Sequence, residues 1–540
     1  MKTPSVSSVR KASSNGSKPE SAAPPVTLAV MSQLLDPPAA CDAAEVSPEE
    51  LLHPESVGGL RSAHPRATLP SGVGGLWSPA RRALTVGLVL TITLVAFEAL
   101  AVSTIMPIVA RELGGLQLYG WVFTAFFLGS LIGIVVVGGI IDRRGLARPF
   151  VVGLVLFGVG LIVGGLTPSM GVLVGARFIQ GVGAGSIPPI AYVAIARSLP
   201  DVLRAPMFAT LSTAWVLPGV IGPAIAGLVA EHTTWRAVFL GLVPLILISG
   251  GMTFSSLRRI GGPVTREESA RPARGGTGRI WNALWVAAGA ALITGGLTNG
   301  SAVRIVSLSV DARVASAGLA LGGLALLLPA FRRLTPPGTL AARRGLPAAV
   351  LLRGILTFAF FGVDAFVAFT LVEWRGLTAA GAGIALTTAT VSWTAGSWVQ
   401  ARGANRLGNG WFVRLGFATL LVGLVAFAFV LIPTVPPWVA IPTFGVAGLG
   451  MGLAYAPLSL IVLRDARAGE QGAATAALSL SDALGTALGT GIAGSIVAAG
   501  LRSGADPGGA VAPAFAVAAS IAGLGLLLSP RLRASRAQGG

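Results

Sequence analysis

The sequence predicts an all-α polytopic membrane protein with about fourteen transmembrane helices, and three observations lead to this fold class. Hydrophobic residues make up 53% of the 540 residues and charged residues only 11%, whereas a soluble domain is roughly a quarter charged. Long apolar runs recur from about Leu84 onward, each near the ~20 residues that cross ~30 Å of hydrocarbon. The runs lack the ~10-residue alternation of a barrel, and helices satisfy their own backbone groups in lipid.

Residues 1–80 are predicted to form a disordered cytoplasmic tail. They are rich in Ser, Pro and Ala with mixed charge and no sustained apolar period, a composition typical of disorder. No basic segment followed by an apolar one precedes the first span, so we expect an uncleaved anchor instead of a signal peptide. Met31 is an alternative start. Residues 531–540 are expected to form a cytoplasmic C-terminal tail.

The apolar runs predict fourteen spans, with ends good to a few residues. They cover roughly 82–108, 119–141, 150–168, 171–197, 206–230, 236–256, 280–299, 312–331, 347–372, 376–398, 411–433, 437–463, 473–500 and 511–529. If the seventh and eighth formed one re-entrant hairpin, twelve spans and an insertion would remain.

Arginine placement tests this map independently, because cytoplasmic loops carry the excess of basic residues. Loops on one side are rich in arginine, and Arg343, Arg344 and Arg353 are counted among the loop residues of that side. The opposite side carries only six arginines, namely Arg111, Arg236, Arg304, Arg313, Arg375 and Arg502. This segregation predicts an inner-membrane protein with an even number of spans and both termini in the cytoplasm.

A weak internal repeat relates the first and ninth spans and the fourth and twelfth. Residues 97–104, with Glu98, are similar to residues 363–370, with Asp364. Two glycine triads also correspond: Gly181, Gly183 and Gly185, and Gly448, Gly450 and Gly452. Many transporters consist of such paired halves, with the ligand site between them near the midplane.

We therefore expect two pseudo-symmetric six-helix halves plus two inserted helices. The N-terminal half covers 81–256, a cytoplasmic linker with the two inserted helices covers 257–346, and the C-terminal half covers 347–530. Chance similarity among Gly- and Ala-rich helices is the alternative explanation of the repeat.

Composition excludes several function classes. The net charge of +18 comes from arginines scattered among short loops, not from one basic face, which argues against a nucleic-acid partner. Cys41 is the one cysteine and the three histidines lie in the tail or a loop, so we expect no metal site and no cofactor. The three lysines lie within the first eighteen residues. A phosphate-binding loop needs a lysine after its glycines, so ATP is not expected as a partner.

The loop after the second span carries Gly138, Asp142, Arg143, Gly145 and Arg148. This spacing resembles the cytoplasmic signature of the major facilitator superfamily. Gly145 suits a tight reversal, the aspartate can lie against a helix N-terminus, and the arginines can bridge carboxylates or lipid phosphates. Such a cluster could act as a conformational latch. The alternative is simple positive-inside anchoring, which would not explain the glycine and aspartate spacing.

The fourth span carries Arg177, Gln180 and Gly181, which resemble the second signature of the same superfamily. An arginine about six residues inside a membrane helix is costly and needs a partner or water. Snorkelling of the long side chain to the outer interface is the alternative.

The fifth span contains Pro218, Gly219, Gly222, Pro223 and Gly227. They resemble the third signature, which in this superfamily marks proton-coupled exporters more than importers. Glycines allow close helix approach and prolines bend a helix. Gly-rich packing without a transport role is the alternative.

Three carboxylates lie inside predicted spans: Glu98, Asp364 and Asp482. A medium of low dielectric favours the neutral form of a carboxylate, so these groups can load and release protons. Glu98 precedes Pro107 by nine positions, a pattern similar to that of the fourteen-span drug:proton antiporters. That branch usually has aspartate at position 98 and asparagine where Ser103 stands. For Asp482, polar packing is as good an explanation as coupling.

The resemblance covers residues 81–533 and implies export of small, lipophilic or cationic molecules in exchange for protons. Glu98, Asp364 and Arg177 would carry the coupling, with Asp482 as a further candidate. Protons, a small-molecule substrate and membrane lipid are the expected partners of a monomer. An exporter of a native lipid or metabolite, or a proton-coupled importer of the same superfamily, is the alternative. A membrane enzyme is disfavoured because the loops offer neither paired aspartates nor an intramembrane histidine.

Overall fold

The computed structural model describes residues 75–79, 81–259, 276–298, 303–305, 308–310, 312–467 and 470–532. These residues are mainly helical, with one short antiparallel hairpin of β1 (Val303–Ile305) and β2 (Leu308–Val310) that the sequence did not predict. The predicted tails lie largely outside the described residues, as do residues 260–275 of the predicted linker.

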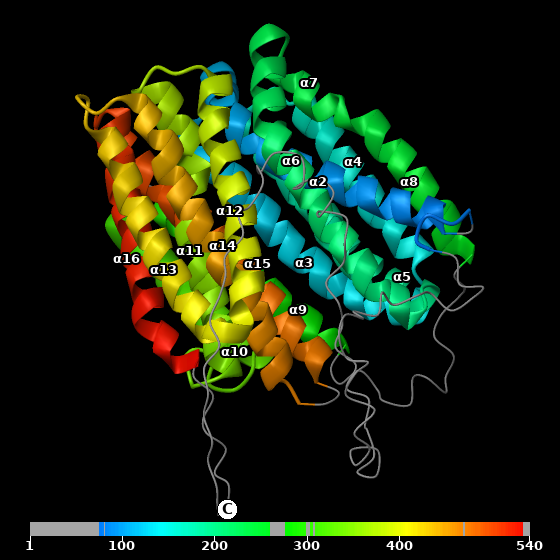
Figure 1. Ribbon diagram of the computed structural model, residues 1–540. Helices are drawn as coiled ribbons and strands as arrows, with labels where there is room; N and C mark the ends of the chain where they lie inside the picture. The colour runs from blue at the N-terminus through cyan, green and yellow to red at the C-terminus, as the bar shows by residue number, and fades with distance from the viewer. Residues whose placement is uncertain are drawn as a thin grey trace, which may run out of the picture. The chain divides into compact units, whose positions relative to one another are not determined.

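The helices fall into an N-terminal group, an inserted pair and a C-terminal group (Figure 1). The N-terminal group comprises α2 (Arg82–Leu113), η3 (Leu116–Leu118), α3 (Tyr119–Arg144), α4 (Ala147–Gly165), α5 (Met170–Ser198), α6 (Asp201–His232), α7 (Trp235–Leu240) and α8 (Leu242–Arg259). The inserted pair is α9 (Gly276–Thr298) and α10 (Ala312–Leu334). The C-terminal group comprises α11 (Leu346–Phe369), η4 (Thr370–Trp374), α12 (Ala379–Leu407), α13 (Asn409–Ala428), η5 (Phe429–Leu431), η6 (Pro437–Val439), α14 (Ala440–Asp465), α15 (Gln471–Arg502), α16 (Pro507–Leu528) and η7 (Ser529–Leu532).

Each of the fourteen predicted spans coincides with a helix, but the count of fourteen crossings is approximate. Twelve helices of the described residues are long and apolar enough to span a membrane, and α7 with α8 counts as one of them. α6 and α12 are not among the twelve. Threonines and serines lower the hydropathy of α12, and α6 offers only a shorter apolar stretch, Leu217–His232.

The inserted helices α9 and α10 pack closely along each other, with Gly289 against Gly323. Each has 23 residues, about 34 Å of helix. Both are among the twelve candidate spans. The lengths therefore favour two crossings over a re-entrant hairpin.

The glycine triads confirm the internal repeat at the level of packing. In α5, a Cβ at Gly181 or Gly185 would meet the α3 backbone, and one at Gly183 would meet the α4 backbone. In α14, the outer glycines face the α12 backbone and Gly450 faces α13. The fourth helix of each group therefore packs on the second and third helices of its group in the same alternating way.

The two groups meet chiefly along two helix pairs, α6 with α12 and α3 with α15, and α2 also contacts α11 and α12. The fifth helix of each group thus packs on the second helix of the other, as expected for pseudo-symmetric halves. α9 contacts both α3 and α15. The inserted pair therefore lies beside one of the two seams.

Candidate functional site

Glu98 and Arg177 form an ion pair inside the N-terminal group. Glu98 lies on α2 and Arg177 on α5, and their side chains are only 1% and 2% exposed. The Arg177 guanidinium also donates to the Gln180 side-chain oxygen at 2.7 Å and to the Val122 carbonyl at 3.3 Å. Arg177 is thus fixed by its partners inside the helix bundle, and the structure does not favour the snorkelling alternative.

Aromatic packing completes the surroundings of Arg177. Its guanidinium carbon lies 4.2 Å from the centre of the Phe126 ring on α3, within the range of a cation–π contact. The Phe126 ring offers no oxygen atom, so Glu98 and Gln180 supply the side-chain oxygens bound to Arg177.

Two polar atoms of this cluster have no hydrogen-bond partner among the described residues, namely Glu98 Oε2 and Gln180 Nε2. A buried polar atom without a partner is costly, so such atoms are common at functional sites. One Glu98 oxygen is therefore able to take up a proton without first losing a hydrogen bond.

Asp364 does not join this cluster. It is partly buried on α11, and no hydrogen bond or ion pair of its side chain is present within the described part of the chain. The equivalent position of Glu98 and Asp364 in their helices follows the repeat. The two carboxylates nevertheless have different surroundings, because no described arginine pairs with Asp364 as Arg177 pairs with Glu98.

Asp482 belongs to a separate buried cluster in the C-terminal group. Its two oxygens accept from Arg353 Nε and from the Tyr455 hydroxyl, both at 3.0 Å. The Arg353 guanidinium also lies over the Tyr455 ring and donates to the Tyr455 carbonyl. The assignment of Arg353 to a loop was wrong, because it lies about two turns inside α11 and is buried. Arg353 is therefore a second buried arginine near these spans, besides Arg177.

The predicted latch loop has the expected backbone reversal. α3 ends at Arg144, and Gly145 follows with φ of +71° while its amide bonds to the Ile141 carbonyl. Positive φ favours glycine, which explains the residue at this turn. The side chains of Asp142 and Arg143 lie outside the described atoms, Gly138 lies in open surroundings and Arg148 is exposed. The latch role stays a prediction.

The fifth-span motif lies on the face of α6 that meets the C-terminal group. Pro218, Gly219, Gly222, Pro223 and Gly227 are all buried. A Cβ at Gly219 would meet Thr390, and one at Gly227 would meet the Ala380 backbone, both on α12. Gly222 faces the Phe97 ring of α2, next to Glu98. The motif therefore allows close contact across the seam between the groups.

Polar contacts of the described residues join the two groups, and the first two that follow lie near the end where α2 and α6 finish. Arg111 and Glu373 form an ion pair with 2.7 Å between Nε and Oε1. Glu231 accepts from the Ala380 backbone amide at the start of α12, at 2.8 Å. Thr124 and Thr490 share a hydrogen bond of 3.1 Å.

Sequence reasoning did not single out Glu231 or Glu373. The available signal was their position, since both are acidic residues at the ends of apolar segments on the arginine-poor side. A π-helical turn, η4, carries Glu373 just beyond α11. No group of three His, Cys, Asp or Glu side chains suited to a metal ion is found among the residues that the structure describes.

Comparison with known proteins gives the family. A family model described as Major Facilitator Superfamily matches residues 88–490. The chain belongs to the major facilitator superfamily. The crystal structure of a D-xylose-proton symporter shares the superfamily fold with a TM-score of 0.57 at 14% identity, covering 83% of this chain and 97% of that one. At this identity the likeness concerns the fold.

Two curated relatives match shorter segments. A "Probable multidrug-efflux transporter" of Mycobacterium tuberculosis is 33% identical over 165 residues, which are 29% of this chain and 35% of the relative. "Multidrug resistance protein 3" of Bacillus subtilis is 29% identical over 166 residues, 31% of this chain and 32% of the relative. The matches thus cover about a third of each relative's length. As a superfamily member, the chain is a multi-pass membrane protein with the fold of a transporter.

Proposed function

We propose that this protein is a proton-coupled secondary transporter that exports small lipophilic or cationic molecules by alternating access. The names of the two relatives support multidrug-type efflux. The buried fifth-span motif at the seam between the groups supports the drug:proton antiporter branch. The observation that carries proton coupling is Glu98, whose buried carboxylate is ion-paired at one oxygen and without a partner at the other among the described residues.

Glu98 would take up a proton in one state and release it in the other. Protonation removes the negative charge and so weakens the attraction to Arg177, which still has Gln180 and the Val122 carbonyl as acceptors. When Glu98 is ionised, its negative charge offsets the positive charge of Arg177. A positively charged substrate would therefore be repelled less by the site in this state. Coupling requires that proton and substrate favour different states of the same element.

The moving elements would be the two six-helix halves, 81–256 and 347–530. They meet along α6 with α12 and along α3 with α15, so a rocking motion would pivot on these seams. The ion pair of Arg111 with Glu373 and the bond from Ala380 to Glu231 would stabilise the state in which that end is closed. The loop with Asp142 would stabilise the opposite state.

We place the arginine-rich loops in the cytoplasm, because basic residues accumulate there. Both termini would then be cytoplasmic and the protein would reside in the inner membrane. The contacts of Glu231 and Glu373 would close the outer end. The partners would be protons, a small-molecule substrate and surrounding lipid, with no need for ATP and a monomer as the working unit.

Reconstituted vesicles with an imposed pH gradient test the coupling. A panel of lipophilic cations and neutral lipophiles is added, and substrate-dependent proton flux is recorded with an internal pH dye. Glu98→Gln is expected to abolish this flux while the protein still inserts, and Asp364→Asn to reduce it. Glu112→Gln is the matched control, because Glu112 lies on the same helix but pairs with Arg236 at its exposed end.

The outcome decides between the proposal and its alternatives. Retained coupling in Glu98→Gln would remove Glu98 from the mechanism. Flux only with a phospholipid or a native metabolite would point to the alternative exporter. Proton and substrate moving in the same direction would identify an importer.

A further inference from the structure

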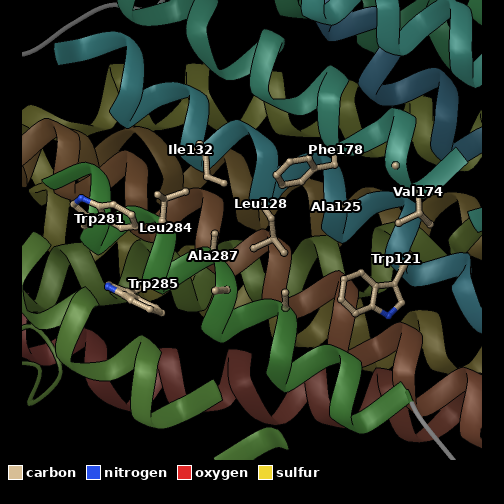
Figure 2. Close-up of a pocket in the computed structure, with 13 residues that line it drawn as sticks. Trp121, Ala125, Leu128, Ile132, Val174, Phe178, Trp281, Leu284, Trp285 and Ala287 are labelled. Atoms are coloured by element: carbon tan, nitrogen blue, oxygen red, sulfur yellow. The ribbon is translucent and has the colours of Figure 1, made fainter. Parts of the chain in front are cut away.

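A cavity of about 510 Å³ lies between α9 of the inserted pair and helices α3 and α5 of the N-terminal group (Figure 2). On α3 its wall follows one helix face from Trp121 to Ile132, and on α5 it includes Gly175 and Phe178. On α9 the wall runs from Trp281 to Ala291. The cavity is thus separate from the ion pair of Glu98 and Arg177.

The wall of this cavity is apolar. Its thirteen residues are Trp, Phe, Leu, Ile, Val, Ala and Gly, with no charged or amide side chain. The Trp121 ring N–H is directed to the Thr298 hydroxyl, at 3.2 Å. Sites for polar small molecules usually place a few convergent polar groups in an apolar pocket. Here such groups are missing from the wall, which favours a hydrocarbon ligand.

The cavity opens where the bilayer would lie. α3, α5 and α9 are all candidate spans. Phe178, Trp281 and Trp285 of the wall are 40%, 59% and 46% exposed, and so would face lipid. From Trp281 to Ala291 the wall is about 15 Å long, half of the ~30 Å hydrocarbon core. One leaflet is one acyl chain thick, so the wall matches the length of such a chain.

We propose that this cavity binds one acyl chain of a membrane phospholipid. The chain fills the space between the inserted pair and the N-terminal group. α9 is joined to α15 by two hydrogen bonds: the Thr298 and Ser495 hydroxyls share one of 2.8 Å, and Ser495 donates to the Thr294 carbonyl at 3.1 Å. The inserted pair is therefore hydrogen-bonded to both groups, through Trp121 of α3 and Ser495 of α15, and the lipid occupies only part of its boundary with the N-terminal group.

The bound chain also supports the wall behind the ion pair. Phe178 of the cavity is the neighbour of Arg177 on α5, and Ala125 is the neighbour of Phe126 on α3. α5 thus carries Phe178 toward the acyl chain and Arg177 toward Glu98. α3 carries Ala125 toward the chain and Phe126 against the Arg177 guanidinium. Lipid occupancy is thus positioned to affect how firmly α3 and α5 hold Arg177.

Photo-crosslinking tests the proposal. The full-length protein is reconstituted in vesicles of phosphatidylethanolamine and phosphatidylglycerol that contain a phosphatidylcholine with a diazirine in its acyl chain, and labelled peptides are mapped by mass spectrometry. We expect label at Val174, Phe178 and Trp285 in excess over Val155 and Val159. The last two are exposed residues of α4 outside the cavity and report ordinary contact with lipid.

Two glycines of α5 provide a matched pair of variants. A Cβ at Gly175 or at Gly171 meets no atom within 4 Å, but only Gly175 lines the cavity. Gly175→Phe is expected to lower cavity labelling about tenfold, the change expected when the chain loses burial of two methylene groups. Gly171→Phe should leave it unchanged. Ala288→Phe fills the same cavity from α9 and replaces Gly175→Phe if that variant fails to fold.

The opposite results would overturn the proposal. Labelling that is equal on α4 and in the cavity would mean ordinary contact with lipid. Labelling that is unchanged in both filling variants would show that the cavity holds no chain. Displacement of the lipid label by a photoreactive lipophilic cation would identify the cavity as a cargo site instead. The proposal needs only membrane insertion, so its failure would leave the Glu98 flux experiment unaffected.

Discussion

Arg353 of α11 and Asp482 of α15 form an ion pair, with 3.0 Å between Nε and Oδ1, that ties the first helix of the C-terminal group to the fifth. Tyr455 of α14 donates to the other carboxylate oxygen. Three helices thus meet at one buried cluster. The Asp482 side chain is 28% exposed and that of Arg353 only 6%, so the arginine is the group that depends most on its partner.

Removing Asp482 is therefore expected to destabilise the fold. Asp482→Leu leaves a buried guanidinium without its counter-ion, and we expect the free energy of unfolding to fall by about 3 kcal/mol. Unfolding by SDS in mixed micelles, followed by circular dichroism, measures the change. The double variant Arg353→Leu/Asp482→Leu should recover part of the loss, because no unpaired charge remains. Additive losses would argue against a specific pair.

The contacts between the two groups at the end where α2 and α6 finish give a second prediction. Replacing Glu231 and Glu373 by glutamine removes the charge that interacts with the start of α12 and with Arg111. Because these groups are partly exposed, the closed state should lose only about 1–2 kcal/mol in total. That corresponds to a shift of roughly fivefold to thirtyfold in the population of the open state.

Spin-label distances report this shift. Labels at His232 and Thr434, both exposed, would lie on the two groups near this end, after Cys41 has been replaced. The double variant should show a larger fraction of long distances than the parent protein. Glu470→Gln, an exposed change before α15, is the control. An unchanged distribution in the double variant would mean that these contacts do not set the equilibrium.

The helices were predictable because apolar length is a local property of the chain. Each predicted span coincides with a helix, and the glycine triads correctly indicated equivalent packing in the two groups. The position of Arg353 was not predictable in the same way. Near the start of a span, an arginine resembles a loop anchor, and its partner Asp482 is 129 positions away.

The candidate site was also predicted only in part. Glu98 and Arg177 stood out because charge deep inside a membrane helix needs a partner, and the structure pairs them. Gln180 was noted only as part of a motif, although its spacing of three residues from Arg177 places both side chains on one face of α5. The contacts of Glu231 and Glu373 required knowing which helices are neighbours, which the order of spans alone does not give.

Arg177 offers a third prediction, because its guanidinium contacts Glu98, Gln180 and the Val122 carbonyl at once. Lysine keeps the charge but lacks the planar fork. Arg177→Lys is expected to lose about two hydrogen bonds, or roughly 2 kcal/mol of stability, and most of the transport rate. Arg236→Lys is the control, since its pair with Glu112 is exposed and contributes little. Equal effects of the two changes would contradict a special role for the buried arginine.

The last prediction uses the repeat. Gly181 and Gly448 occupy equivalent positions, each against the backbone of the second helix of its group. A leucine at either position cannot be accommodated by a side-chain rotation, because the obstacle is backbone, so the helices must separate. Each substitution should cost about 3 kcal/mol or more. Gly158→Leu on α4 meets open space and should be nearly neutral in the same SDS titration. A true repeat places the same obstacle behind both glycines, so the two substitutions should lower the stability by similar amounts. Strongly different losses would mean that the packing of the two halves is less symmetric than their backbones indicate.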